Sequence, residues 1–217
     1  GGVRLAVGDE AVVPERAELL SAEREGNAVT MRWRVSAGDT EAEVAYTYRL
    51  WNKSLVIDTI CLGGAVAEVA YGFAEGLENP RLVTNPYYNY RPGRPSVAVA
   101  GPADAPLFVT GNTDWYRSNS SILFGANEIV AERVNYQGGA RYNQKTDGAR
   151  NDCFERFFVT VSPVYEEVLP TIPNPRSPWY DVTGSRVWRA HGVSNREADE
   201  AYWRRVHRYG MTEVVVT

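Results

Sequence analysis

The sequence predicts an all-β protein: a large antiparallel β-sandwich, followed by a proline-rich strap, one C-terminal helix and a final strand. Three observations lead to this fold class. Apolar and polar residues alternate in the first half, short apolar runs separated by turn residues fill the middle, and a helical pattern stands near the C-terminus. We expect the sandwich over residues 1–169, the strap over 170–193, and the helix with the final strand over 194–217.

Three strands are predicted in succession in the first half. Apolar and polar residues alternate through residues 28–35 and again through 41–50, the pattern of a strand with one face in the core. Asn52 and Lys53 supply a turn, and residues 54–62 form the next strand. The apolar positions of the first two strands are Val29, Met31, Trp33 and Val35, then Ala42, Val44, Tyr46, Tyr48 and Leu50.

Further short apolar runs follow, separated by Gly, Pro, Asn and Asp. They read SVAVAG, LFVTG, SSILFG, EIVAERVNY, ARYNQKT and CFERFFVTV. Many short strands with frequent turn residues favour a sandwich or barrel over βαβ units.

The strap is the segment LPTIPNPRSPW, which contains Pro170, Pro173, Pro175 and Pro178. Each proline lacks an N–H and restricts the residue before it, so this segment cannot join the middle of a sheet. Beyond it, Ser194 and Glu197 form a capping box, and apolar residues then recur three or four apart. With Gly210 at the position of a left-handed C-cap, we expect a helix over residues 195–209.

The final segment, MTEVVVT, reads as a buried strand directly after that helix. A helix followed by a β-branched run is typical of an α/β unit, whose strand needs neighbours. We expect residues 211–216 to begin an α/β domain that continues in a longer protein; the alternative is that they edge the sandwich.

Composition excludes some classes of function. Among 217 residues, 23 basic and 27 acidic side chains give a net charge of −4, which offers no surface for a nucleic-acid backbone. No apolar run is long enough to span a membrane. The start, GGVRLAVGDE, is not a signal peptide, but a mature chain would look the same.

Three segments carry a resemblance to a known family. They are GNTDWYRSNSSILFG, then VNYQGGARYNQKTDGARNDCFERFFVTVSP, then EEVLPTIPNPRSPW. They resemble the N-terminal, galactose-mutarotase-like β-supersandwich domain of large bacterial glycoside hydrolases, distantly similar to the endo-α-N-acetylgalactosaminidase type. In that family a catalytic (β/α)8 barrel follows the sandwich.

The resemblance implies an accessory domain that packs against a catalytic barrel of the same parent chain, shapes the sugar cleft and is inert alone. It implies that the catalytic carboxylates lie on the barrel, and we do not expect Glu213 to be one of them. We expect an extracytoplasmic location, periplasmic or secreted, and no cofactor. A self-contained carbohydrate-binding module is the alternative.

An aldose mutarotase is a further, weaker alternative. Ring opening needs a general acid and a general base, and residues 1–185 contain no histidine; His191 and His207 lie in the strap and on the helix. Metal binding is weakly supported as well. Asp147, Asn151 and Asp152 lie in TDGARND, which reads better as a plain turn than as a Ca²⁺ site.

Sugar binding is the chemistry that the sequence favours, because aromatic faces stand beside polar groups in predicted loops. The candidate residues are Tyr87, Tyr88, Tyr90 and Arg91 (with Arg94 nearby) in NPYYNYRPGRP, and Trp115, Tyr116 and Arg117 in NTDWYRSN. Packing at a rim or domain interface is the alternative for both. The segment ARYNQKTDGAR adds Arg141, Tyr142, Lys145 and Arg150, with a solvated hairpin as the alternative.

Two cysteines, Cys61 and Cys153, lie far apart in the sequence and lack metal-ligand spacing. We expect two separate buried thiols, because buried cysteine usually behaves as a small apolar side chain. A disulfide between them is the alternative.

Overall fold

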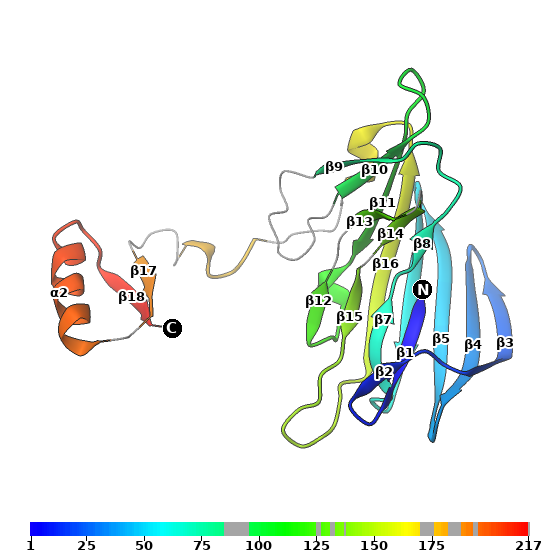
Figure 1. The fold of residues 1–217 in the computed structure, drawn as a ribbon, viewed down its shortest axis with the longest axis horizontal. Helices are drawn as coiled ribbons and strands as arrows, with labels where there is room; N and C mark the ends of the chain where they lie inside the picture. The colour runs from blue at the N-terminus through cyan, green and yellow to red at the C-terminus, as the bar shows by residue number, and fades with distance from the viewer. Residues whose placement is uncertain are drawn as a thin grey trace. The chain divides into compact units, whose positions relative to one another are not determined.

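The computed structural model forms two compact units, Gly1–Thr171 and Ile172–Thr217, which we describe separately (Figure 1). The structure describes residues 1–84, 96–124, 127–130, 133–136, 138–169, 176–181, 188–192 and 195–216. The first unit consists of antiparallel sheets, so the predicted fold class, an all-β sandwich with one C-terminal helix and a final strand, is confirmed.

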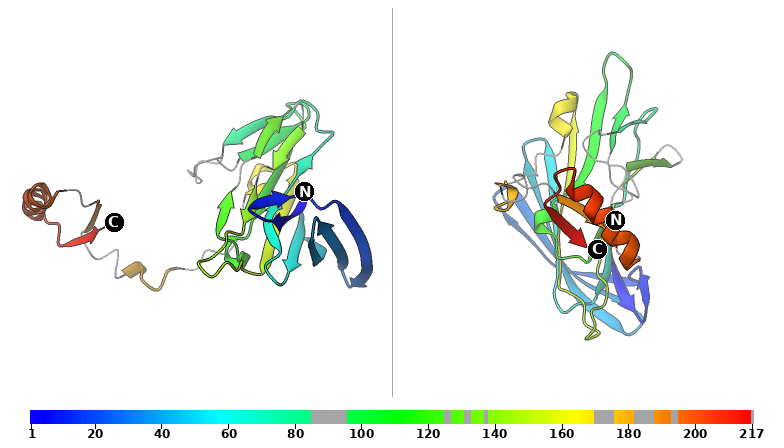
Figure 2. Two further views of the ribbon diagram at one scale, coloured as in Figure 1. Left: turned by 60° about the horizontal axis from the view of Figure 1, so that its bottom comes forward. Right: turned by 90° about the vertical axis from the view of Figure 1, so that its left-hand side faces the viewer.

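The larger sheet has eight strands and provides one layer of the sandwich. Its strands, in spatial order, are β3 (Arg16–Glu25), β4 (Ala28–Ala37), β5 (Thr40–Trp51), β6 (Ser54–Cys61), β16 (Cys153–Ser162), β11 (Leu107–Thr113), β10 (Ser96–Ala100) and β9 (Arg81–Thr84). β3 forms one edge (Figure 2). The three strands predicted in the first half of the sequence are β4, β5 and β6, and Asn52 adopts the left-handed conformation (φ 51°) in the turn between β5 and β6.

The smaller sheet has five strands and provides the other layer. Its strands, in spatial order, are β12 (Ile122–Phe124), β15 (Gly139–Arg141), β7 (Val66–Ala70), β1 (Gly2–Val7) and β2 (Glu10–Val12). In Figure 1, β1 and β7 lie in front of β5 and β16 of the larger sheet. A third sheet joins β13 (Asn127–Val130), β14 (Arg133–Tyr136) and β8 (Phe73–Ala74).

The main core lies between these two layers. Leu5 of β1 and Ala140 of β15 are fully buried, and they share one cluster with Val35 of β4 and Val44 of β5. The alternation predicted for β4 is observed, because Val35 is buried whereas Arg32 and Arg34 are exposed. Each buried Val or Leu side chain contributes about 1.5–3 kcal/mol, so this core is the main source of stability for the sandwich.

The second unit is a β–α–β arrangement. β17 (Trp188–His191) and β18 (Glu213–Val216) pair in parallel, with α2 (Arg196–His207) between them in the chain. The partner of β18 is thus β17, which lies within residues 170–193, the range expected for the strap. The helix expected over residues 195–209 is α2. Among the described residues, no helix is long and apolar enough to cross a membrane.

The capping of α2 differs from the prediction at its start. The N-cap is Asn195, whose side-chain oxygen accepts a hydrogen bond from the backbone N–H of Ala198 at 3.0 Å. The backbone N–H of Asn195 in turn donates to the Asp199 carboxylate at 3.2 Å. The expected cap, Ser194, lies outside the described residues. The predicted C-terminal signal is observed, because Gly210 adopts φ +89° and its amide donates to the His207 carbonyl at 3.0 Å.

Candidate functional site

The predicted residues Trp115, Tyr116 and Arg117 form the 3-10 helix η1 (Trp115–Arg117), which we call the aromatic turn. The Asp114 carboxylate accepts a hydrogen bond from the Tyr116 amide at 3.1 Å, and the Asp114 amide donates to the Arg156 carbonyl of β16 at 2.9 Å. Trp115 is 39% exposed and Tyr116 is 52% exposed, with their ring centroids 5.9 Å apart. Two partly exposed rings and an exposed arginine therefore stand on a turn that is anchored to the larger sheet.

The tyrosine group lies elsewhere in the sequence. Tyr87, Tyr88, Tyr90 and Arg91 fall within residues 85–95, outside the described residues, so their role in sugar binding stays a prediction. The third predicted group is described: Arg141, Tyr142 and Arg150 line a common pocket, and Lys145 does not.

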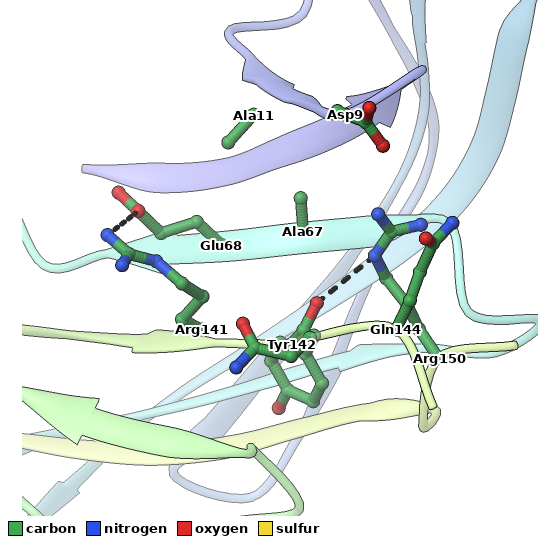
Figure 3. Close-up of a pocket in the computed structure, with 9 residues that line it drawn as sticks. Asp9, Ala11, Ala67, Glu68, Arg141, Tyr142, Gln144 and Arg150 are labelled. Atoms are coloured by element: carbon green, nitrogen blue, oxygen red, sulfur yellow. Dashed lines mark hydrogen bonds and ion pairs between the residues drawn. The ribbon is translucent and has the colours of Figure 1, made fainter. Parts of the chain in front are cut away.

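This pocket, which we call the polar pocket, has a volume of about 410 Å³ (Figure 3). It is lined by Asp9, Ala11, Ala67, Glu68, Arg141, Tyr142, Asn143, Gln144 and Arg150. Two of the lining residues are acidic and two are basic, and the others include two side-chain amides. The lining therefore offers both hydrogen-bond donors and acceptors with balanced charge.

The walls of the polar pocket come from three parts of the first unit. Ala67 and Glu68 belong to β7, and Arg141 ends β15. Asp9 stands in the two-residue turn between β1 and β2, where Gly8 adopts φ +59° as a tight hairpin requires. The loop after β15, residues 142–152, supplies the remaining wall, and we call it the pocket loop.

Glu68 forms a fixed ion-pair network across three strands. Arg4 of β1 and Arg141 of β15 are its direct cross-strand neighbours. Its carboxylate lies 3.2 Å from the Arg4 guanidinium and 3.3 Å from that of Arg141, and Glu68 is only 8% exposed. A buried carboxylate paired on two sides holds its position, so this wall is rigid.

Arg150 is held by its own loop. Its Nε donates to the Tyr142 carbonyl at 3.1 Å, and Figure 3 shows the guanidinium beside the amide of Gln144, on the side of the pocket that carries Asp9. Among the described residues, no carboxylate forms an ion pair with Arg150. Its terminal nitrogens therefore remain available as donors to a ligand.

Hydrogen bonds join the segment that follows the aromatic turn to the loop of the polar pocket. The backbone N–H of Asn143 donates to the Ser121 hydroxyl at 3.0 Å. The Asn119 side chain donates to the Asp152 carbonyl at 3.0 Å, and Asn151 donates back to the Asn119 carbonyl at 3.0 Å. The segment that follows the aromatic turn thus braces the loop that lines the pocket.

Beneath the pocket, the Tyr142 side chain enters the core and donates a hydrogen bond to Glu155. The Ser118 hydroxyl also donates to Glu155 at 3.0 Å, and the second carboxylate oxygen of Glu155 has no partner among the described residues. Burial raises the pKa of Glu155 to about 7, and the hydrogen bonds from Tyr142 and Ser118 oppose this shift in part. Glu155 is 1% exposed and does not line the polar pocket, so it is a structural residue of the core.

The TDGARND segment contains a hydrogen-bonded turn. The Asp147 carboxylate accepts from the Ala149 amide at 2.9 Å, and that of Asp152 accepts from the Gly63 amide at 2.7 Å. Across the described part of the chain, no group of three or more His, Cys, Asp or Glu side chains could hold a metal ion.

Sequence reasoning missed several residues of the polar pocket: Asp9, Glu68, Asn143 and Gln144. The last two lie inside the segment ARYNQKTDGAR, whose charged and aromatic residues alone were selected. Asp9 and Glu68 are distant in sequence, and only strand pairing brings them to this place.

Comparison with known proteins does not assign the chain to a family. No protein-family model matches the sequence, and no curated protein matches it. The chemical interpretation of the site therefore depends on its geometry.

Proposed function

We propose that this chain is a non-catalytic accessory β-sandwich domain of a glycoside hydrolase, which packs against a catalytic barrel and contacts carbohydrate. The observation that carries the proposal is the polar pocket, whose balanced donors and acceptors are held by fixed walls.

A saccharide suits this pocket because each sugar hydroxyl both donates and accepts a hydrogen bond. Asp9 can accept from hydroxyl groups, whereas Arg150 and Gln144 can donate to them. The Asp9 carboxylate disfavours a phosphate ligand, since it would lie close to the phosphate charge, whereas the charge of Glu68 is compensated by Arg4 and Arg141. A volume of about 410 Å³ is within the usual range for small-molecule sites.

The aromatic turn supports the same function. The Trp115 and Tyr116 rings are partly exposed, and Arg117 stands beside them. Aromatic faces pack on the apolar face of a pyranose while the polar groups around them contact its hydroxyls. Because Asn119 and Ser121, which closely follow this turn, are hydrogen-bonded to the loop that lines the pocket, one oligosaccharide contacting both surfaces is part of the proposal.

The accessory role is supported by the second unit. A parallel pair of strands with an intervening helix is the unit from which α/β domains are built, and parallel sheets are covered on both faces. We propose that β17, α2 and β18 belong to the catalytic domain. The natural coding sequence checks this point: a long run of alternating strands and helices after β18 supports it, and a stop codon there opposes it.

A self-contained carbohydrate-binding module is the second candidate. It is favoured by one observation, which is that both the polar pocket and the aromatic turn are built from the first unit.

The binding proposal is tested on the whole chain by a glycan array of neutral and acidic oligosaccharides, followed by calorimetry with the best glycan. Gln144→Ala and Trp115→Ala should each weaken binding about tenfold, because each removes one hydrogen bond or stacking contact. Trp51→Ala is the matched control, since Trp51 is 46% exposed and lies at the end of β5. No binding to any glycan, or equal binding by all variants, would refute the proposal.

A further inference from the structure

Cys61 and Cys153 are direct neighbours across two strands. Cys61 ends β6, Cys153 begins β16, and the two residues are paired in the antiparallel register. Both are 1% exposed and belong to the same core cluster between the sheets, so their side chains share one side of the larger sheet.

This placement meets the geometric requirement for a disulfide. Directly opposed residues of antiparallel strands have Cα atoms about 4.5–5.5 Å apart. A disulfide joins residues whose Cα atoms are about 4.4–6.8 Å apart and whose Cβ atoms point to the same side. The direct pairing of the two residues therefore allows the bond.

In the structure both side chains are free thiols. Burial raises the pKa of Cys61 to about 11 and that of Cys153 to about 12, so the folded protein holds them protonated near neutral pH. The thiolate is the reactive form, and a buried thiol reacts slowly. We therefore expect the two cysteines to be oxidised while the chain is folding, before they are buried in the core.

We propose that Cys61 and Cys153 are a cross-strand disulfide site, which closes when the chain folds in the presence of a low-molecular-weight disulfide. The thiolate of one cysteine attacks a sulfur of oxidised glutathione, forming a mixed disulfide and releasing one glutathione thiolate. The second cysteine thiolate attacks the protein sulfur of that mixed disulfide and releases the second glutathione. The protein loses two protons and two electrons, and oxidised glutathione is reduced to two thiols.

The bond would link the C-terminal end of the pocket loop covalently to the end of β6. Cys153 directly follows Asp152, and the Asp152 carboxylate accepts a hydrogen bond from the Gly63 amide, two residues after Cys61. The end of the loop that lines the polar pocket is thus already tied to the end of β6. A covalent link at the adjacent position constrains the unfolded chain strongly, because it closes a long loop.

The test is to unfold the whole chain, refold it in a mixture of reduced and oxidised glutathione, and alkylate it in denaturant. The expected product has an intact mass about 2 Da lower and no alkylated cysteine. Its melting temperature should exceed that of the reduced protein by roughly 5–15 °C. Cys61→Ser is the control, since it retains one thiol and cannot show the mass loss.

Recovery of two alkylated cysteines from the refolded protein would overturn the proposal. If the chain does not refold in vitro, the same mass measurement on protein produced in an oxidising bacterial periplasm decides the question. This inference is independent of sugar binding, which the glycan experiments measure separately.

Discussion

Tyr142 links the pocket to the core, because its hydroxyl donates a hydrogen bond to the buried carboxylate of Glu155 while its carbonyl accepts one from Arg150. The hydroxyl also accepts a hydrogen bond from the Phe154 amide at 3.1 Å. One residue thus connects the loop that lines the polar pocket with β16 of the larger sheet.

Replacing Tyr142 by Phe should destabilise the protein by about 1–3 kcal/mol, because a buried carboxylate and a buried amide each lose a partner. Urea unfolding measures the change. Tyr48→Phe is the matched control: Tyr48 is half-buried, and its hydroxyl has no described hydrogen-bond partner. Equal stability of the two variants would show that the Tyr142 hydroxyl contributes nothing.

Glu155 should make the stability of the protein depend on pH. Its pKa is raised from 4.5 to about 7 in the folded protein, chiefly by burial. Below pH 4.5 the carboxyl is protonated in both states and its contribution is fully present. As the pH rises from 4.5 to 7 the unfolded carboxyl ionises first, so stability falls, by up to about 3 kcal/mol.

Glu155→Gln removes this ionisation and should flatten that part of the profile. The measurement is the free energy of unfolding of both proteins at several pH values between 4 and 8. The difference between them should shift in favour of the variant as the pH rises. Parallel curves would mean that Glu155 titrates alike in the folded and unfolded states.

Much of the fold follows from local patterns in the sequence. The period-two alternation predicts β4 and β5, and the turn at Asn52 and Lys53 predicts β6 after them, because hairpins of adjacent strands keep one face of each strand in the core. The helix α2 was predicted from its apolar spacing and from Gly210, although its cap proved to be Asn195. Capping depends on which side chain meets the first free amides, and Ser and Asn are both suited to this position.

The polar pocket was predictable only in part, because its residues meet through long-range pairing. Arg141 and Arg150 stand in one polar segment, which marked them as candidates. Glu68 gave no such signal, since it lies in an apolar run and is placed by pairing of β7 with β1 and β15. The register between strands so distant in sequence is set by the whole core rather than by neighbouring residues.

Asp58 should be far more sensitive to substitution than the exposed ion pairs. It is 8% exposed, and Arg156 donates two hydrogen bonds to it, at 2.6 and 2.9 Å, while Arg49 donates a third at 2.9 Å. Asp58→Ala leaves two guanidinium groups without their partner and should cost about 3–5 kcal/mol.

The control for Asp58 is Glu18→Ala, because Glu18 pairs with Arg34 on the surface, where both side chains are largely exposed. Exposed pairs contribute about 0–1 kcal/mol, since solvent screens the charges. Thermal and urea unfolding measure both variants. A loss below 1 kcal/mol for Asp58→Ala would place this network among the surface pairs.

Two adjacent glycines allow the position of the pocket loop to be tested without substituting any residue that lines the pocket. Gly64 adopts φ +69°, and a Cβ there would lie 2.9 Å from the Arg150 carbonyl oxygen. Gly63 adopts φ +85°, but a Cβ there would meet nothing within 4 Å. Alanine at either position pays the backbone strain of a left-handed conformation, about 1 kcal/mol. The clash with Arg150 is specific to Gly64→Ala.

Gly64→Ala should therefore be less stable than Gly63→Ala by about 1 kcal/mol or more, since backbone must move to relieve the contact. Because the displaced residue is Arg150, Gly64→Ala should also weaken binding of the glycan selected on the array, whereas Gly63→Ala should bind it as the unmodified protein does. Calorimetry and urea unfolding on the same pair separate the two effects. Equal stability and equal binding would show that the Gly64–Arg150 approach does not position the loop, and the guanidinium of Arg150 would then be held by its hydrogen bond to the Tyr142 carbonyl alone.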